Sequence, residues 1–452
     1  MKNWQKTSLA IALATATAGA AFAAGHAAPT RGSGAYSWDS LAQFDSMDLS
    51  GVTVTVAGPW LAPEDDYIRR VFEPFEQATG AVIEYNGSDS FEQQILIDAQ
   101  AGTPPNVAFF PQPGLASDMA SRGYLTPVSD DVRETVLENY AAGQSWVDLA
   151  TYDNENDQKD FYGVFYRADV KSLVWYSPDN FADYGYDVPD TMEELIELTE
   201  QIAADGETPW CIGLGSGAAT GWPATDWIED IMLRTQPPEV YDEWVSHEMR
   251  FNDARVTKAI ETFGFFAKND DFVAGGAEAV GTTDFRDSPK DLFSVPPKCF
   301  MHRQASFIPA FFPEGTVVGE DVDFFYFPAY ESKDLGKPVL GAGTVAGITK
   351  SNEATEAVLA YLLTPLAHEL WMEKGNFLTA NTKVNTDLYA SETQKALGDI
   401  LLNATTFRFD GSDLMPGAIG AGAFWTGMVD YVSGKSAQRV ANEIEQSWKE
   451  IE

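Results

Sequence analysis

The chain has 452 residues, 44% hydrophobic and 13% aromatic, so it is long enough for two domains with cores of their own and too apolar for a disordered protein. Its 68 acidic residues outnumber 29 basic ones, and the formal net charge of −39 excludes nucleic acids and anionic membrane surfaces as natural partners. Such a charge is typical of a solvated acidic surface and does not identify a ligand.

The first residues have the composition of a secretory signal. Lys2 and Lys6 precede an apolar stretch, and a small-x-small cleavage site ends at Ala23. We therefore expect removal of residues 1–23 and a periplasmic location. No cysteine follows this site to carry a lipid, and no later run of about 18 apolar residues predicts a membrane span. Residues 24–44, rich in Ala, Gly and Ser, are predicted to form a loose leader.

The next segment alternates between strand and helix patterns, which predicts a mostly parallel sheet. The predicted elements are strands at 52–56, 82–85 and 106–110, a helix through Ile68, Val71, Phe72 and Phe75 that ends at Gly80, and a helix that begins at a capping box of Ser90 and Gln93. Ligands of such sheets bind beyond the carboxyl ends of the strands. The loops at 58–63, 86–90 and 111–114 are therefore candidates for a binding site.

Residues 161–180 are predicted to be a strand that leaves one domain and enters another. Its centre, Leu173, Val174, Trp175 and Tyr176, is aromatic and β-branched and too short for a buried helix. A new helix then begins at a capping box of Thr191 and Glu194. The predicted first lobe comprises residues 45–168 plus 338–390, and the second lobe comprises residues 169–337 plus 391–452.

Two glycine-rich segments follow. Residues 215–221 form a flexible loop before Trp222, and the segment from Gly341 to Thr344 is predicted to be a tight turn. This turn either brings its backbone close to a ligand or has a purely structural role.

Cys211 and Cys299 are the only cysteines. In an oxidising compartment a single pair favours a disulfide, with two buried thiols as the alternative. A metal site would need histidine partners, and the chain has only four scattered histidines.

Catalytic motifs are absent from the sequence. It contains no dinucleotide loop, no P-loop and no Gly-x-Ser-x-Gly elbow. Asp153, Glu155 and Asp157 imitate the start of a calcium loop, but Gln158 stands where glycine is required. We therefore expect no catalytic residue, no cofactor and no metal.

Aromatic residues recur in the predicted loops. Sugars present apolar C–H faces and a rim of hydroxyls, so a sugar site needs flat aromatic platforms beside hydrogen-bonding groups. Each aromatic residue could instead belong to a core, but their shared position at strand ends favours a site. They are Trp60, Phe110, Trp222, Phe307 and Trp425.

Several segments, in this order, resemble the periplasmic sugar-binding proteins of ABC importers, the extracellular solute-binding proteins of family 1 that include the maltose binder. The segments are FEQATG, GTPPNVAFFPQPG, YGVFYRADVKSLVWYS, TMEEL, GWPATDW and AFW. The resemblance implies an α/β, two-lobe periplasmic-binding-protein (Venus flytrap) fold with several hinge crossings. It also implies a protein without catalytic activity that delivers a sugar to inner-membrane ABC permease subunits. Among these proteins, the α-glucoside binders look most similar.

The resemblance and the loop positions together predict a set of ligand-binding residues: Gly58, Trp60, Ser88, Asp89, Phe110, Gln112, Arg167, Asp169, Trp222, Gln304, Phe307, Gly341, Gly343 and Trp425. Where maltose binders carry acidic groups, this sequence has Val170 and Gly217, which favours a short glucoside over maltodextrin. Arg167 and Asp169 either replace one of those groups or form an internal ion pair that braces the hinge.

Two other classes of function remain open from the sequence. A secreted carbohydrate-active enzyme would turn over glycosides, whereas a binding protein would return them unchanged. A binder of a non-sugar solute, such as an amino acid, a polyamine or iron, is the other alternative, and the aromatic loops argue against it. By its resemblance the protein is expected to be a monomer.

Overall fold

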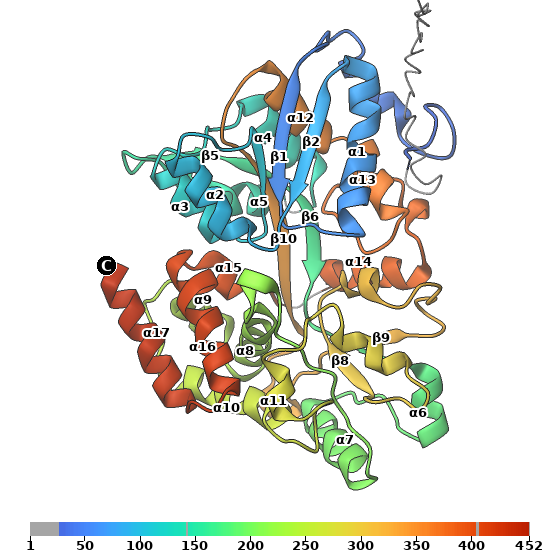
Figure 1. The fold of residues 1–452 in the computed structure, drawn as a ribbon, viewed down its shortest axis with the longest axis vertical. Helices are drawn as coiled ribbons and strands as arrows, with labels where there is room; N and C mark the ends of the chain where they lie inside the picture. Colours follow the sequence, from blue (N-terminus) through green and yellow to red (C-terminus); the bar gives the residue numbers. More distant parts are fainter. Residues whose placement is uncertain (1–26, 142, 404–405, 452) are drawn as a thin grey trace, which may run out of the picture.

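The structure is a computed structural model that describes residues 27–141, 143–403 and 406–451, and it has two lobes (Figure 1). The predicted signal peptide, residues 1–23, lies outside the described residues. The upper lobe in Figure 1 contains β1 (Thr53–Gly58), β2 (Val82–Gly87), β3 (Val107–Phe110), β4 (Thr151–Asp153), β5 (Lys159–Phe161), α1 (Glu64–Thr79), α2 (Phe91–Gln100), α3 (Pro113–Ser121), α4 (Asp130–Asn139), α5 (Gly143–Leu149), α12 (Glu353–Leu362) and α13 (Pro365–Met372).

The lower lobe is richer in helices. It contains β7 (Leu173–Tyr176), β8 (Met301–Arg303), β9 (Asp323–Tyr326), α6 (Pro178–Tyr184), α7 (Met192–Ala204), α8 (Trp222–Thr235), α9 (Pro238–Val245), α10 (Ala254–Ala267), α11 (Ala277–Val280), α15 (Gly411–Leu414), the π-helix η7 (Ala418–Phe424), α16 (Trp425–Val432) and α17 (Ala437–Ile451). Four elements lie at or across the junction: β6 (Gly163–Val170), β10 (Pro338–Ile348), α14 (Glu392–Asn403) and β11 (Thr406–Phe409).

The main sheet has the strand order β11-β10-β3-β1-β2, with β6 paired to β10. β1 runs parallel to both β2 and β3, as the alternation of strands and helices predicted. β10 is antiparallel to β3 and to β6. The carboxyl ends of the three parallel strands therefore lie on one edge of the sheet, facing the second lobe.

The helix ends test the predicted caps. Gly80 ends α1 with φ 79°, a left-handed conformation that favours glycine, as predicted. Thr191 accepts a hydrogen bond from the backbone N–H of Glu194, and Glu194 completes the predicted capping box. The predicted box at Ser90 is wrong, because the Ser90 side chain makes no capping hydrogen bond.

The crossing segment is two strands rather than one. β6 pairs with β10, whereas β7 pairs with β8 and β9 in the second lobe. The break falls at Lys171 and Ser172, where the Lys171 amide still donates to Leu340 but the Ser172 hydroxyl turns to accept from the Leu340 amide and to donate to Asp230. The predicted crossing is confirmed, and the predicted continuity of the strand is wrong.

The predicted tight turn from Gly341 to Thr344 is also wrong, because these residues lie in the middle of β10. Their glycines serve packing instead. A Cβ atom on Gly341 would clash with the ring of Phe407, and one on Gly343 would lie 2.9 Å from Cδ1 of Phe165. Glycine is required because aromatic rings lie directly on the strand backbone.

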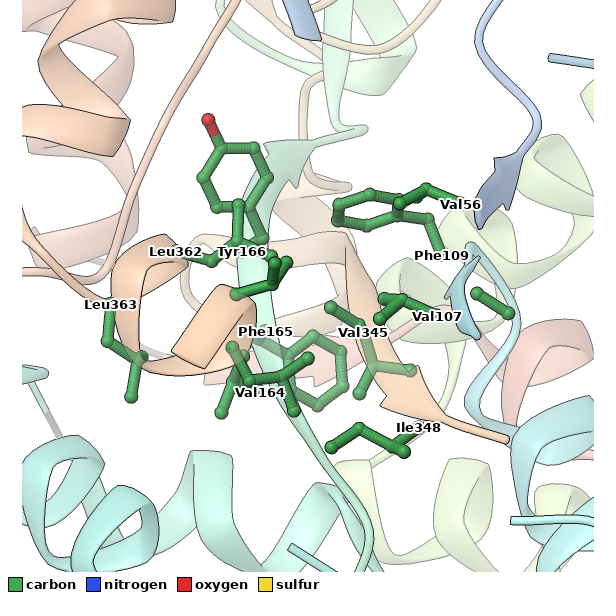
Figure 2. Packing of buried hydrophobic residues seen from close by; sticks show 14 of the residues in the cluster. Val56, Val107, Phe109, Val164, Phe165, Tyr166, Val345, Ile348, Leu362 and Leu363 are labelled. Carbon is green, nitrogen blue, oxygen red and sulfur yellow. The ribbon is translucent and has the colours of Figure 1, made fainter. Parts of the chain in front are cut away.

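The first core surrounds the main sheet and includes residues from β1, β3, β6 and β10 (Figure 2). It also includes Trp38, Leu41 and Phe44 from the 3₁₀ helix η1 (Trp38–Phe44). The ring of Phe44 lies 5.5 Å from that of Phe75. The predicted loose leader is therefore wrong for these residues, since their apolar side chains are buried against α1 and α12.

A second core fills the lower lobe, and a third lies at the junction around Val170, Leu173 and Trp175. On this distribution we propose the lobe boundaries that the sequence predicted, after residues 168, 337 and 390. Phe409 departs from the division, because it packs in the first core. Within the described ranges, the structure has no helix that is long and apolar enough to cross a membrane.

Cys211 and Cys299 form a disulfide in the structure, with their Cα atoms 5.5 Å apart. Both residues are buried in the third core, and 88 positions separate them in the sequence. The bond therefore closes a long loop within the second lobe.

We expect the double variant Cys211→Ala/Cys299→Ala to lose roughly 4 to 5 kcal/mol of unfolding free energy, because a loop of this length gains much conformational entropy in the unfolded chain when the cross-link is removed. Urea unfolding of the variant and of the oxidised and reduced wild type measures the loss. Titration of denatured, unreduced protein should find no free thiol. Two free thiols in periplasmic preparations would contradict the pairing.

Candidate functional site

A cavity lies between the two lobes, with a volume of about 1000 Å³ when its open mouth is included. This is enough space for a small organic ligand. All three loops predicted from the strand ends contribute to it, through Pro59 to Leu61, Ser88 and Asp89, and Pro111 and Gln112. The second lobe supplies the facing wall, and β6 and β10 supply the side where the lobes join.

Most of the predicted binding residues line this cavity. They are Trp60, Ser88, Asp89, Gln112, Arg167, Asp169, Trp222, Phe307, Gly343 and Trp425. Their position is consistent with ligand contact, which stays a prediction because no ligand is present in the structure.

The remaining predicted residues do not line the cavity. Phe110 is completely buried in the first core, with its ring 5.7 Å from that of Phe91. Gly58 packs against Tyr85 and Phe109, and Gly341 packs against Phe407. The Gln304 side chain accepts a hydrogen bond from the Ala305 amide. Because neighbouring side chains occupy the space around these residues, we do not carry them into the proposed site.

Sequence reasoning missed several charged residues of the cavity. Glu64 and Glu92 each lie in the first turn of the helix that follows a predicted loop, so the position of the loop was the signal that could have found them. Asp226 lies one helical turn after Trp222, on the same face of α8. Asp410 and Asp413 gave no local signal, because only the fold brings residues this late in the chain to the junction.

Aromatic rings form the wall on the side of the second lobe. The indole of Trp222 lies 5.0 Å from the ring of Phe285 and 5.9 Å from that of Phe307, measured between ring centroids. Trp425 lies at the start of α16 and lines the same cavity. Rings held by other rings are rigid, so they offer flat apolar surface at low entropic cost.

Phe424 is a core residue, whereas its neighbour Trp425, only 4% exposed, lines the cavity. Phe424 is completely buried and packs against Phe251 at 4.9 Å and Trp244 at 5.8 Å. Trp425 is outside the three core clusters, and its indole N–H has no hydrogen-bond partner. A buried donor without a partner is costly, so a ligand acceptor at this position would be stabilising.

On the first lobe, Gln112 has a hydrogen-bond acceptor without a partner among the described residues. Its side chain is 7% exposed, and its Oε1 atom has no hydrogen-bond donor. The cavity therefore holds an unpaired donor on one lobe and an unpaired acceptor on the other.

Arg167 is buried where β6 approaches the cavity. Its guanidinium donates to Glu64 at 2.6 Å and to Asp169 at 3.3 Å, and it lies 5.5 Å from the ring centroid of Phe307. Burial lowers the pKa of Arg167, but the two carboxylates outweigh burial and raise it. The predicted internal ion pair is present, and the same groups line the cavity.

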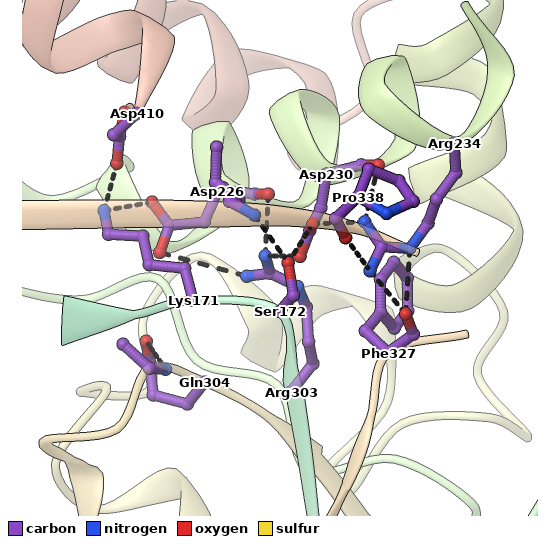
Figure 3. A network of polar contacts seen from close by, with 12 residues as sticks. Lys171, Ser172, Asp226, Asp230, Arg234, Arg303, Gln304, Phe327, Pro338 and Asp410 are labelled. Carbon is purple, nitrogen blue, oxygen red and sulfur yellow. Dashed lines mark hydrogen bonds and ion pairs between the residues drawn. The ribbon is translucent and has the colours of Figure 1, made fainter. Parts of the chain in front are cut away.

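A buried ionic network joins the crossing segment to the second lobe (Figure 3). Lys171 donates to Asp226 at 2.8 Å and to Asp410. Arg303 donates to the Asp226 carbonyl at 2.9 Å and pairs with Asp230.

Arg234 continues this network from the other side. It pairs with Asp230 at 2.5 Å and donates to backbone carbonyls of Phe327 and Pro338. Pro338 is the first residue of β10, so the network connects both crossing strands with α8.

Glu229 lies beside the network, so four carboxyl groups, including those of Asp226, Asp230 and Asp410, are near three basic side chains. Burial raises the pKa of Asp226 to about 7 and raises that of Glu229 well above its ordinary value. Burial would raise the pKa of Asp410 too, but Lys171 outweighs it and holds that pKa below its usual range. Oxygens of these three carboxyl groups lie within 4.8 Å of one another. The Lys171 ammonium already pairs with two of them, which leaves little reason for a metal ion.

With this geometry in view, comparison with known proteins decides the family. Residues 58–381 match the family of bacterial extracellular solute-binding proteins. The chain belongs to this family. Members of the family are binding proteins, so the chain is a solute-binding protein and not an enzyme, and the family is an extracellular one.

Two characterised relatives cover nearly the whole chain. The alpha-glucosides-binding periplasmic protein AglE of Rhizobium meliloti is 60% identical over 92% of this chain and 91% of its own length. The osmoprotective compounds-binding protein GgtB of Synechocystis is 41% identical over 87% of this chain and 92% of its own length.

Solved structures support the fold alone. The bacterial solute receptor AcbH, described with an exclusive preference for β-D-galactopyranose, gives a TM-score of 0.74 at 20% identity and covers 89% of this chain and 100% of its own. Maltose-bound MalE3 of T. maritima gives a TM-score of 0.69 at 16% identity, with 89% and 100% covered. The solute-binding protein thus has the predicted two-lobe α/β fold.

We expect Lys171→Met to destabilise the solute-binding protein by about 3 to 5 kcal/mol at neutral pH, because it leaves the buried Asp226 and Asp410 without their cation. Unpaired buried carboxyl groups take up protons, so their pKa in the folded state rises above that in the unfolded state. The deficit should therefore shrink as the pH falls toward their unfolded values.

Urea unfolding at neutral and acidic pH measures this effect. Lys258→Met is the control, because the Lys258 side chain is 75% exposed and its ion pair with Glu261, at 3.5 Å, lies on the surface. Equal unfolding free energies for Lys171→Met and the control would contradict a structural role for the ion pairs.

Proposed function

We propose that the protein captures a short α-glucoside in the periplasm and delivers it to the permease subunits of an inner-membrane ABC transporter. The observation that carries the proposal is the lining of one cavity by the aromatic rings of Trp222 and Trp425 from one lobe and by Gln112 from the other. The 60% identity with a protein named for alpha-glucoside binding supports this ligand class.

The physical fit to a sugar rests on both kinds of surface. A glucosyl ring offers an apolar face for stacking and hydroxyls that donate and accept hydrogen bonds. The cavity lining combines the aromatic rings of Trp60, Trp222 and Trp425 with polar side chains such as Gln112, so a sugar could use both kinds of surface. Closure of the two lobes, as in the hinge motion of periplasmic binding proteins, would enclose the sugar between them.

The location and assembly state complete the proposal. We propose that residues 1–23 are a signal peptide cleaved near Ala23, on the composition of that segment. The carrier is proposed to act as a monomer, since a single chain supplies both walls of the cavity.

A thermal-shift screen of the mature protein tests the ligand class. The panel contains glucose, galactose, maltose, sucrose, trehalose and raffinose, with glycine betaine, ectoine, an amino acid mixture and putrescine as non-sugar solutes. A sugar at 100 times its Kd stabilises the folded state by about 2.7 kcal/mol, which should raise Tm by roughly a few degrees. A shift with betaine, ectoine or putrescine and none with any sugar would reject the proposal.

Trp425→Ala should weaken binding of the sugar by a factor of about 10 to 1,000, because it removes a stacking surface from a desolvated pocket. Isothermal titration calorimetry measures Kd, and a thermal melt measures stability. Trp448→Ala is the matched control, because that buried indole packs in the second core and stacks on His247 far from the cavity lining.

We expect the control to lose roughly 3 to 5 kcal/mol of stability with an unchanged Kd. If Trp425→Ala behaves like the control, with normal binding and a much lower Tm, then Trp425 is a core residue and the proposed sugar platform is elsewhere.

A further inference from the structure

The basic groups of the cavity are all neutralised by the protein itself. Arg167 pairs with Glu64 and Asp169, and Lys171 pairs with Asp226 and Asp410. Arg286 forms a two-pronged pair with Asp284, with both N–O distances 2.8 Å. Among the described residues of the lining, no basic side chain is left to bind an anion.

Two acidic groups of the same cavity, in contrast, are not paired with a basic side chain of the described residues. Glu92, on the first turn of α2, and Asp413, on α15, form no ion pair with a basic residue in the part of the chain that the structure describes. The nearest cation to Asp413 is Lys171, which Asp226 and Asp410 already hold. The cavity therefore has an excess of acidic groups.

These two groups lie on opposite lobes beside Gln112. Glu92, Gln112 and Asp413 line the same cavity, and Glu92 is close enough to Asp413 to raise its pKa. A Cβ atom on Gly114, two residues after Gln112, would lie 2.9 Å from the Asp413 carbonyl oxygen, so α3 and α15 are in direct contact here. We name Glu92, Gln112 and Asp413 the acceptor face.

Gln112 supplies an independent sign that the acceptor face awaits a hydrogen-bond donor. Gln112 lines the cavity and is only 7% exposed. Its Oε1 atom accepts no hydrogen bond from the described residues. Burial raises the pKa of Glu92 to about 7 and raises that of Asp413 well above its ordinary value, as expected of carboxyl groups without a cation.

We propose that the acceptor face selects ligands by charge: the site takes an α-glucoside that bears a protonated amine more tightly than the neutral sugar, and it rejects an anionic one. The inference rests on the proposed function for the sugar part of the ligand. An ammonium donates only, so it matches a face of acceptors, and it neutralises the excess of acidic groups. A phosphate or carboxylate would meet like charge with no free cation to pair with.

The test compares three ligands of one shape by calorimetry at neutral pH: trehalose, trehalosamine and trehalose 6-phosphate. The wild type should bind trehalosamine about tenfold more tightly than trehalose and should not detectably bind the phosphate. Glu92→Gln and Asp413→Asn keep the shapes of the side chains and each remove one carboxyl group that can ionise beside an ammonium. Each should reduce the preference for trehalosamine severalfold, measured as the ratio of the Kd values of trehalose and trehalosamine for the same variant.

Glu197→Gln is the control, because it removes one charge from an exposed position on α7 outside the cavity. It should keep the full preference, which separates a local effect from a change in net charge. Glu92→Gln is the safer variant if Asp413→Asn lowers stability, because Glu92 is only half-buried. A thermal melt of each variant checks folding.

The outcomes separate this inference from the proposed function. Equal Kd values for trehalose and trehalosamine, binding of trehalose 6-phosphate, or a preference that neither variant reduces would overturn the inference alone. If trehalosamine does not bind while the thermal screen finds a neutral α-glucoside that does, the inference is likewise overturned and the proposed function stands. Trehalosamine binding without any neutral sugar would support charge selection and reject the neutral α-glucoside, and failure of every sugar would overturn both.

Discussion

The ion pairs of Lys171 with Asp226 and Asp410 are the interaction that fixes the crossing segment to the second lobe. Lys171 lies where β6 ends and β7 has not begun, so it marks the passage from one lobe to the other. Its partners come from α8 and from the residue after β11. Separating buried charges is expensive, so these three segments must keep their positions relative to one another.

The strand β10 meets the same junction in a different way. Its glycines allow the rings of Phe407 and Phe165 to lie on the backbone, which brings β11 and β6 close on either side. Gly343 and Thr344 then reach the cavity beside Arg167. A cavity built on crossing strands is well placed to respond to hinge motion, because residues that line it also join the lobes.

The chemistry of the cavity follows from which groups the protein satisfies and which it leaves open. Arg167 and Lys171 are paired with carboxylates, so they hold the neighbouring side chains in place and offer no free positive charge to a ligand. Among the described residues, the Gln112 Oε1 atom and the Trp425 indole N–H have no hydrogen-bond partner, and Glu92 and Asp413 form no ion pair. In the proposed function the ligand would supply the missing partners.

Local pattern was sufficient for the features that depend on near neighbours in the chain. The cap at Thr191 and Glu194, the end of α1 at Gly80 and the parallel strands of the first lobe were predictable, because a few adjacent residues decide each. The order of the motifs likewise indicated a two-lobe solute-binding protein. The loops at strand ends located Trp60, Asp89 and Gln112 at the cavity.

Features that depend on residues far apart required the tertiary structure. The sequence could not show that Phe110 is core while Trp425 faces the cavity, because both are aromatic residues at the ends of elements. Nor could it show that Gly341 accommodates a ring from β11. By itself it determined the class of fold and the loops of the site; only the packing of the lobes decided which side chains are paired and which are left for the ligand, because burial and ion pairing join segments hundreds of residues apart.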